Sequence, residues 1–411
     1  MRSTASPLFI LVLLILVQIC VGLRLPPQIN SLSSGHHLEE GQNLIISPAS
    51  AVLSLVALYL CSSGKLNEQL RNLLWLSESE NDVRDTFKSI LHDHTNRGFE
   101  LLLANKIYLS SAHPVLPSFR ELLTSTLNAN VDNIDFKDSE AATDNINQWV
   151  ALQTKNKVLN LIQNVPPKTA FIFVNALHLR ATWDQPFNRN RTSEKKFHMT
   201  HTKTVNVNMM HLEAEVPYGH LSAIEAEVLQ LRFRNSCLSM YILLPDRLED
   251  LQKLVKRMSQ FDAMSLPKHL VNTRMSITIP KFNIDSSHNL IPPLASLGLT
   301  DIFVSHRYPK LTSSTVPIKV DQIHQKAVIK VNEIGVEASA ATGIVTKHPV
   351  AIECKKFFVA NRPFAFYIQD KNIVYFHGFV QGFPTRNGHS SQTTEELRRK
   401  NSLLKAAGDN D

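Results

Sequence analysis

The pattern of apolar and polar residues predicts a central buried strand over residues 171–179. This run, FIFVNALHL, is almost wholly apolar and contains Asn175. A strand covered on both faces of a large sheet has this pattern, whereas a half-exposed strand alternates. Asn175 must find hydrogen-bond partners, because an unpaired buried amide costs about 1–3 kcal/mol.

Residues 43–64 predict a buried helix. The segment NLIISPASAVLSLVALYLCSSG is apolar on nearly all sides after its first turn, which is typical of a helix inside a core. Ser47 or Ser50 can cap this helix, and Pro48 suits its first turn.

Further elements follow from period-two and period-3.6 patterns. A helix over 139–162, which Ser139 could cap, has an apolar stripe of Ile146, Trp149, Val150 and Leu152. Helical spacing also covers 66–94 and 248–264. Strands are predicted at 101–109, 131–136, 275–282 and 327–333, with two in 228–246 and a strand pair in 373–384.

Between the strand at 327–333 and a strand start at 356–364 lies a long segment without a clear element, and such loops are usually functional or disordered. In its first half Val336, Ala338, Ala340 and Thr342 alternate with Glu337, Ser339, Ala341 and Gly343. The first set is small and mostly apolar, so the segment could enter a crowded sheet as a strand. The alternative is an Ala-rich loop or a single helical turn.

Composition narrows the class of protein. The chain has 411 residues, 43% of them hydrophobic, which is ample for a large core, and a net charge of +7. This charge permits weak attraction to polyanions. It is not gathered into a basic stripe with interleaved aromatics, so the sequence argues against nucleic-acid binding.

The two ends of the chain differ from its middle. Arg2 precedes an apolar run at 8–21, followed by small residues, which predicts a secretory signal peptide over 1–22. Residues 23–42 read as a leader and 385–411 as a polar, disordered or weakly helical tail. The run is short for a membrane span, so we expect a secreted, extracellular protein.

Cysteine and histidine usage gives no sign of a metal site or of redox chemistry. Without Cys20 of the signal peptide, three cysteines remain, Cys61, Cys237 and Cys354, and no C-x-x-C occurs. His198 and His201 fit a solvated hairpin better than a metal site, since no third ligand is evident. G-x-S-x-G, H-E-x-x-H, P-loop and G-x-G-x-x-G motifs are also missing, so we expect neither an enzyme nor a cofactor. Asn190-Arg191-Thr192 is a glycosylation sequon.

Several motifs together resemble one family. NEIGVEASAAT at 332–342 is similar to the serpin reactive-loop hinge, N-E-E-G-T-E-A-A-A-A-T. VNALHLRATWDQPF at 174–187 is similar to V-N-A-(I/L)-x-F-K-G-x-W-x-x-P-F, and NLIISPAS to N-x-x-x-S-P-x-S. Such motifs occur in order from about residue 43 to 384. The resemblance implies an α+β serpin fold with a large mixed sheet, smaller sheets, about eight or nine helices and an exposed reactive-centre loop, in a monomer.

The resemblance also implies a mechanism in which the chain acts once, on a target serine protease. The protease cleaves the loop and forms an acyl-enzyme, the loop's first half inserts into the main sheet, and the covalently attached protease is distorted. The implied hinge residues are Glu333, Gly335, Val336, Glu337, Ala338, Ser339, Ala340, Ala341 and Thr342. The implied sheet-opening residues are Ser47, Ser50, Asn175, Trp183 and Lys281, with Lys281 as the basic partner of Glu333.

Within the hinge, Gly335 is expected to supply freedom in φ. Val336 is expected to be the first side chain buried on insertion. Two residues depart from the family pattern. Ile334 replaces a polar residue, and Gln325 stands where the family has a histidine, although His324 is adjacent.

The scissile bond remains open between several residues. The usual hinge length places Pro349 just before the cut, where proline is a poor residue. Lys347 suits a trypsin-like protease but shortens the inserting segment, and His348 would leave Pro349 just after the cut. We favour Lys347, with Val350 as the alternative. Because the sequence around Pro349 is a poor cleavage site, a second hypothesis stays open. In it the chain is a non-inhibitory serpin that acts as a carrier, a binding protein or a plain protease substrate.

Overall fold

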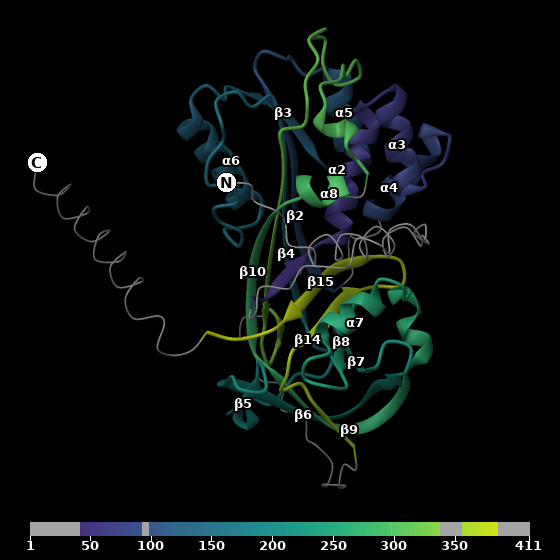
Figure 1. Cartoon of the computed structure of the whole chain (residues 1–411), viewed down its shortest axis with the longest axis vertical. Coiled ribbons are helices and arrows are strands. Elements are labelled where there is room, and N and C mark those ends of the chain that lie inside the picture. Colours follow the sequence, from purple (N-terminus) through teal and green to yellow (C-terminus); the bar gives the residue numbers. More distant parts are fainter. Residues whose placement is uncertain (1–41, 93–97, 297, 338–355, 385–411) are drawn as a thin grey trace, which may run out of the picture.

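Two β-sheets and a group of helices make up the fold (Figure 1). The computed structural model describes residues 42–92, 98–296, 298–337 and 356–384. The signal peptide, nearly all of the leader and the tail predicted from the sequence therefore lie outside the described residues. In the part of the chain that is described, no helix combines the length and the apolar character needed to cross a membrane.

The first sheet has six strands in the order β10, β11, β12, β4, β2, β3. Their bounds are Phe282–Asn289, Gln322–Val331, Gly335–Val336, Phe171–Thr182, Phe99–Ser110 and Asn130–Ile134. The sheet is mixed, because β4 runs parallel to β11 and antiparallel to β2. The first nine residues of β4, 171–179, are all buried, as the apolar run at these positions predicts.

The second sheet has nine strands, and the long strand β6 (Thr204–Leu221) joins its parts. Along one path the order is β1, β15, β14, β8, β7, β6, β9, β13, and β5 pairs with β6. The other bounds are Leu44–Ile46, Val374–Val380, Phe364–Gln369, Ser239–Pro245, Ala226–Arg232, Val271–Pro280, Phe357–Val359 and Ser193–His198. Residues 373–384 thus contain one strand rather than a strand pair, and β15 pairs with β14 on one side and with β1 on the other.

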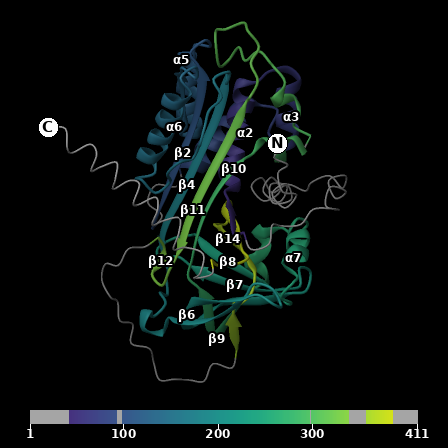
Figure 2. The ribbon, with the colours of Figure 1, turned by 60° about the vertical axis from the view of Figure 1, so that its left-hand side comes forward.

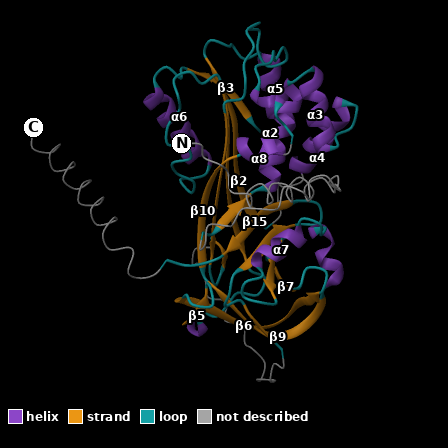
Figure 3. Ribbon diagram, in the orientation of Figure 1, coloured by secondary structure: helices purple, strands orange, loops and turns teal. Residues whose placement is uncertain are grey.

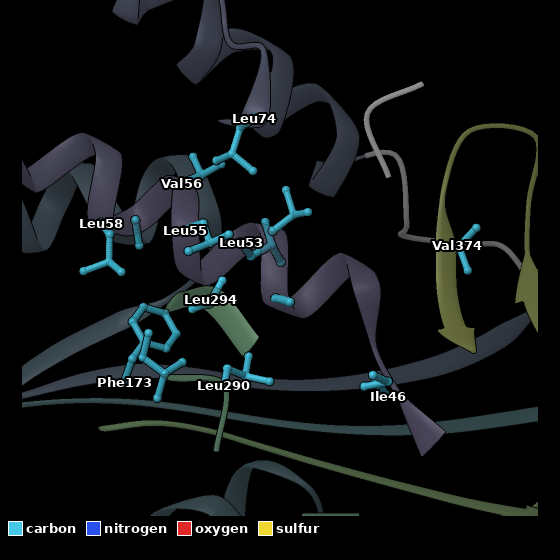
Figure 4. Packing of buried hydrophobic residues seen from close by; sticks show 14 of the residues in the cluster. Ile46, Leu53, Leu55, Val56, Leu58, Leu74, Phe173, Leu290, Leu294 and Val374 are labelled. Carbon is cyan, nitrogen blue, oxygen red and sulfur yellow. The ribbon is translucent and has the colours of Figure 1, made fainter. Parts of the chain in front are cut away.

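Helix α2 (Pro48–Cys61) packs beneath the six-stranded sheet, and only one of its residues, Ala49, is not buried. Ser47 is its N-cap, because the Ser47 side chain accepts a hydrogen bond from the backbone N–H of Ser50. Figure 4 shows Leu53, Leu55 and Leu58 of α2 in one cluster with Phe173 of β4 and Leu290 and Leu294. Cys61 lies buried in this helix, and Cys237 is exposed.

The opposite face of the sheet is covered by α6 (Ser139–Gln153), which crosses in front of β2 and β4 (Figure 2). Two expectations about this helix are wrong. Asp138 caps it rather than Ser139, and it ends at Gln153, since Lys155 and Asn156 adopt positive φ. Ile146 and Val150 pack on the sheet, but Leu152 is 66% exposed, because it falls on the opposite side of the helix.

The remaining helices surround the upper part of the sheet or lie on the second sheet (Figure 3). The region 66–94, predicted to be helical, contains parts of two helices, because Trp75 adopts a left-handed conformation and ends α3. Helix α7 is shorter than the predicted segment 248–264, because it ends at Met258. The bounds are Gly64–Leu74 (α3), Glu80–His92 (α4), Pro117–Leu127 (α5), Leu251–Met258 (α7) and Ile291–Ser296 (α8), with short 3-10 helices at Arg189–Arg191 (η2), Ala263–His269 (η3) and Asp301–Phe303 (η4). The α+β class with a large mixed sheet is confirmed.

Candidate functional site

The site begins at the tight reversal between β11 and β12. The side-chain oxygen of Asn332 accepts hydrogen bonds from the backbone N–H groups of Ile334 at 2.9 Å and Gly335 at 3.2 Å. The N–H of Asn332 donates to the carbonyl of Gly335 at 2.9 Å. Asn and its local side-chain bonds favour such turns, so the chain leaves β11 and at once turns back toward β4.

Strand β12 lies between β11 and β4 and pairs antiparallel with both (Figure 2). Val336 is opposite Val331 of β11 and Ala181 of β4, and its side chain is fully buried. Val336, expected to be the first side chain buried on insertion, is already buried in the sheet of this structure. Gly335 and Val336 therefore occupy the sheet in the uncleaved chain.

Gly335 is required for a reason other than the expected one. It is not among the glycines with positive φ. A Cβ at this position would lie 2.0 Å from the carbonyl oxygen of Ala181, a separation at which the backbone would have to move. Close approach to β4, and not freedom in φ, is what excludes a side chain here.

Glu333, just before β12, is held by two side chains. Lys281 Nζ lies 3.0 Å from Glu333 Oε1, and the Thr192 hydroxyl donates to the same oxygen at 2.9 Å. Burial alone would raise the pKa of Glu333. A backbone hydrogen bond, Lys281 and Thr192 outweigh the burial and lower the pKa below its usual value, so Glu333 is ionised at neutral pH. The Lys281–Glu333 contact that the resemblance implies is present.

Trp183 follows β4 directly and donates two hydrogen bonds to the turn between β11 and β12. Its indole N–H donates to the carbonyl of Asn332 at 2.9 Å, and its backbone N–H donates to the carbonyl of Ile334 at 2.8 Å. The ring is buried and stacked on Phe233, with centroids 4.6 Å apart. Ile334, which departs from the family pattern, thus contributes its backbone to the base of the hinge.

Glu337 is the last described residue of the hinge and forms a small charged cluster. Its φ is +43°, its N–H donates to the carbonyl of Lys330 at 2.7 Å, and its Oε1 lies 2.8 Å from Lys157 Nζ. Its other carboxylate oxygen contacts Nε2 of His178 on β4. His178 is 1% exposed, and burial lowers its pKa despite the nearby Glu337 carboxylate.

Further down the sheet, a buried polar network joins α2 to β2, β4 and β11. Asn175 Nδ2 donates to Asn105 Oδ1 at 2.8 Å, and Asn175 Oδ1 accepts from the Ser54 hydroxyl at 2.6 Å. The Ser50 hydroxyl lies 3.4 Å from Asn105 Oδ1. Ser50 therefore belongs to the network, and the cap is Ser47.

Gln325 extends this network to β11. Its side-chain amide exchanges two hydrogen bonds with the backbone of Ser47, at 3.0 and 2.8 Å. The side chain is fully buried, so the residue that departs from the family pattern ties the first turn of α2 to the sheet. Burial lowers the pKa of the neighbouring His324 to about 4.

The structure does not describe all of the predicted residues. Ala338, Ser339, Ala340, Ala341, Thr342, Lys347, His348, Pro349 and Val350 lie outside the described residues. Asn190 is exposed in η2, and the Thr192 of its sequon reaches Glu333. In the described part of the chain, no group of three or more His, Cys, Asp or Glu residues could hold a metal ion.

Sequence reasoning missed Asn332, His178 and Lys157. Asn332 was visible as the residue before the hinge acid, and Asn before a strand end is a turn signal. His178 and Lys157 gave no local signal, because only the fold brings them to Glu337.

Comparison with known proteins identifies the family. The family model described as serpin (serine protease inhibitor) matches residues 29–381. The human leukocyte elastase inhibitor is 31% identical over 340 residues, which covers 80% of this chain and 89% of that protein. The solved structure of Serpin48 from the insect Tenebrio molitor has a TM-score of 0.78 at 26% identity and covers 93% of this chain and all of that one.

A third match is to a protein whose structure was solved with a bound ligand. The structure of human thyroxine-binding globulin, solved with thyroxine, has a TM-score of 0.77 at 22% identity and covers 92% of this chain and all of that chain. This likeness shows the fold alone. Taken with the match over residues 29–381, the hinge between two strands of a large mixed sheet shows that this chain belongs to the serpin family.

Proposed function

We propose that this chain is a secreted inhibitor of a trypsin-like serine protease that works once, as a suicide substrate. The observation that carries the proposal is β12. Gly335 and Val336 already form a strand between β11 and β4, so the sheet accepts the hinge in the orientation that insertion of a longer segment requires. The small side chains that follow in the sequence suit the same position.

The chemistry belongs to the protease. Its catalytic serine attacks the carbonyl carbon of the scissile residue, Lys347 in our proposal, and the peptide C–N bond breaks. The new amine leaves with a proton from the catalytic histidine, and an ester joins the loop to the serine. This inhibitor contributes a loop that can be cleaved and a sheet that can take up the freed half before water hydrolyses the ester.

The physical basis of the proposed insertion is the strand pairing within the six-stranded sheet. Below β12, β4 pairs directly with β11 in parallel, from Ile172 and Gln322 to His178 and Val328. An inserted strand would replace this one parallel ladder by two antiparallel ladders, and parallel pairing is slightly less stable per residue. The uncleaved form is then kinetically rather than thermodynamically stable.

The first test is incubation of the full secreted chain with trypsin and other serine proteases, followed by denaturing electrophoresis. We expect a band at the summed mass that survives denaturant, and mass spectrometry of the released peptide should place the cut after Lys347. Cleaved chain with fully active protease and no such band across the panel would contradict inhibition and favour a carrier or plain substrate.

The variant that tests insertion into the sheet is Val336→Arg. Because Val336 is fully buried between Ala181 and Val331, an arginine would have to bury its charge, at a cost of several kcal/mol. We expect at least a 100-fold drop in the yield of covalent complex, with cleavage of the loop retained. Lys330→Ala, an exposed substitution on β11 beside the hinge, is the control. Unchanged complex formation by Val336→Arg would contradict insertion.

A further inference from the structure

A pocket of about 300 Å³ lies beside Trp183, where the segment after β4 meets β6, β7 and β9 of the nine-stranded sheet. This volume equals that of about ten molecules in liquid water, so the pocket suits a small ligand. Its apolar wall contains the buried side chains of Trp183, Leu212 and Leu231. Apart from Trp183, its lining residues take no part in the hinge site, so the proposed inhibition does not account for the pocket.

The charged side chains of this pocket are unpaired. Asp184, Glu215 and Arg232 are exposed and line it, and none of the three side chains forms an ion pair or a hydrogen bond within the described part of the chain. Arg274, opposite Glu215 on β9, does not line the pocket. Two carboxylates (−2) and one guanidinium (+1) leave the lining with a net charge of −1. The pocket is therefore complementary to a cation.

Gln230 is an independent sign of a ligand. It lines the pocket and is only 9% exposed, and its Nε2 donates to the Ser239 hydroxyl at 2.8 Å. Its Oε1 accepts no hydrogen bond from any residue that the structure describes. This oxygen is not enclosed by protein, so it faces the open space of the pocket. Polar atoms of buried side chains nearly always have a hydrogen-bond partner, so a ligand in the pocket should bring a donor to this oxygen.

We propose that this pocket binds a small organic cation that carries several N–H donors, such as an amidinium or a guanidinium. Its donors reach the carboxylates of Asp184 and Glu215 and the Oε1 atom of Gln230, which are all acceptors. Its apolar part lies against Trp183, the aromatic residue of the lining, and tryptophan is the best aromatic partner of a cation. This binding site goes beyond the proposed inhibition and does not depend on it.

A metal ion fits the pocket less well than an organic cation. Only two of the lining residues are acids, and no group of three or more His, Cys, Asp or Glu residues in the described ranges could hold a metal. Hard cations such as Ca²⁺ take about six to eight oxygen ligands. The apolar wall also requires an apolar surface on the ligand, which a ring that carries an amidinium supplies.

Binding can be followed at Trp183 itself. The chain has three tryptophans, and Trp183 lines the pocket whereas Trp75 and Trp149 do not. The full chain, with ¹⁵N in its tryptophan side chains, is titrated with benzamidinium, and NMR follows the three indole N–H signals. Trp75→Phe and Trp149→Phe assign the signals. Benzoate and benzamide, which keep the ring but carry a negative charge or none, are the control ligands.

We expect benzamidinium to shift the Trp183 signal until it saturates, with a Kd between about 0.1 and 1 mM. The signals of Trp75 and Trp149 should not move. Benzoate and benzamide should bind at least about tenfold more weakly, because neither brings a positive charge to the two carboxylates.

Variants of the lining test the assignment of the groups. Asp184→Asn and Glu215→Gln should each weaken binding about threefold, as is usual for exposed charge pairs. Gln230→Met, which removes the acceptor at similar size, should weaken it about tenfold, and thermal unfolding checks that this variant is folded. Arg232→Gln should strengthen binding about threefold, because it removes the one repelling charge. Asp144→Asn, at an exposed position of α6, is the matched control and should bind as the wild type.

The outcomes decide the proposal. A Trp183 signal that does not shift to saturation would overturn it, as would equal affinity for benzamidinium and benzoate. Unchanged affinity in both Asp184→Asn and Glu215→Gln would place the cation elsewhere and overturn it too. Because binding is measured without a protease, such a failure leaves the proposed inhibition untouched, and a failure to form the covalent complex leaves the cation site untouched.

Discussion

At the scale of single residues, the hinge depends on what a side chain would touch. Gly335 is needed because a Cβ atom here would lie 2.0 Å from the carbonyl oxygen of Ala181. The sequence could indicate that a glycine belongs here, since glycine serves both unusual φ values and close approach. It could not tell which of the two applies, because the neighbouring residues on β4 are distant in the sequence.

We predict that Gly335→Ala expels β12 from the sheet. The added methyl group would overlap backbone atoms of Ala181 and Thr182, and overpacking costs about 1–3 kcal/mol. Amide exchange in the peptide 330–337 should rise about tenfold or more, as measured by mass spectrometry. Ile334→Ala, one residue earlier and outside β12, is the control. Equal exchange in Gly335→Ala and wild type would show that the backbone relaxes without loss of the strand.

At the scale of elements, β4 and α2 were the most predictable parts. Long apolar patterns leave few alternatives, and Asn175 stood out as a polar residue that had to be paired. The partners themselves, Ser54 and Asn105, come from α2 and β2, and only the fold identifies them. The end of α6 was predicted too late, because the positive φ of Lys155 and Asn156 is a local choice that helical spacing does not reveal.

We predict that Asn175→Ala destabilises the protein by about 2–4 kcal/mol, since it leaves the Ser54 hydroxyl and the Asn105 carbonyl short of a partner in a fully buried site. Reversible urea unfolding of the uncleaved form measures the loss. Asn145→Ala, at an exposed position of α6, should change stability by less than about 0.5 kcal/mol. A loss in Asn175→Ala no larger than in this control would contradict the network.

At the scale of the whole molecule, the fold class and the presence of the main strands followed from the sequence, chiefly through the serpin-like motifs. The sequence did not predict that the expected smaller sheets form one nine-stranded sheet through the 18-residue β6. A strand that pairs with several other strands has no distinct sequence pattern. The pairing of β12 before cleavage was also missed. It depends on backbone partners in two distant strands.

Buried histidines predict how the whole molecule responds to acid. Burial lowers the pKa of His377 to about 3 and that of His288 to about 4. In the unfolded chain these residues take up protons below about pH 6.5, whereas in the folded protein they stay neutral until the pH falls to about 4 or 3. Stability is therefore complete above about pH 6.5 and is lost as the pH falls toward 4. Thermal unfolding of the uncleaved form should shift to lower temperature across this range.

We predict that His377→Phe reduces this acid sensitivity. His377 is fully buried against Tyr367 and Phe379, and neither ring nitrogen has a hydrogen-bond partner among the described residues. At pH 5 the variant should lose about 2 kcal/mol less than the wild type relative to pH 8. His201→Phe, on the exposed turn after β5, should lose as much as the wild type. Parallel pH curves for His377→Phe and wild type would contradict the prediction.

The hydrogen bond from Thr192 to Glu333 affects how the predicted glycosylation site at Asn190 can be tested. Thr192 is both the third residue of the Asn190 sequon and a direct contact of the hinge. A substitution of Thr192 would remove the sequon and the hydrogen bond to Glu333 in one step, so its effect on the proposed inhibition could not be traced to either. Asn190→Gln removes the acceptor alone, since the Asn190 side chain is exposed, and Thr192→Ser keeps both the sequon and the hydroxyl. Asn190→Gln then reports the effect of losing the sequon alone, and any further change in Thr192→Ala reports the effect of losing the contact to Glu333.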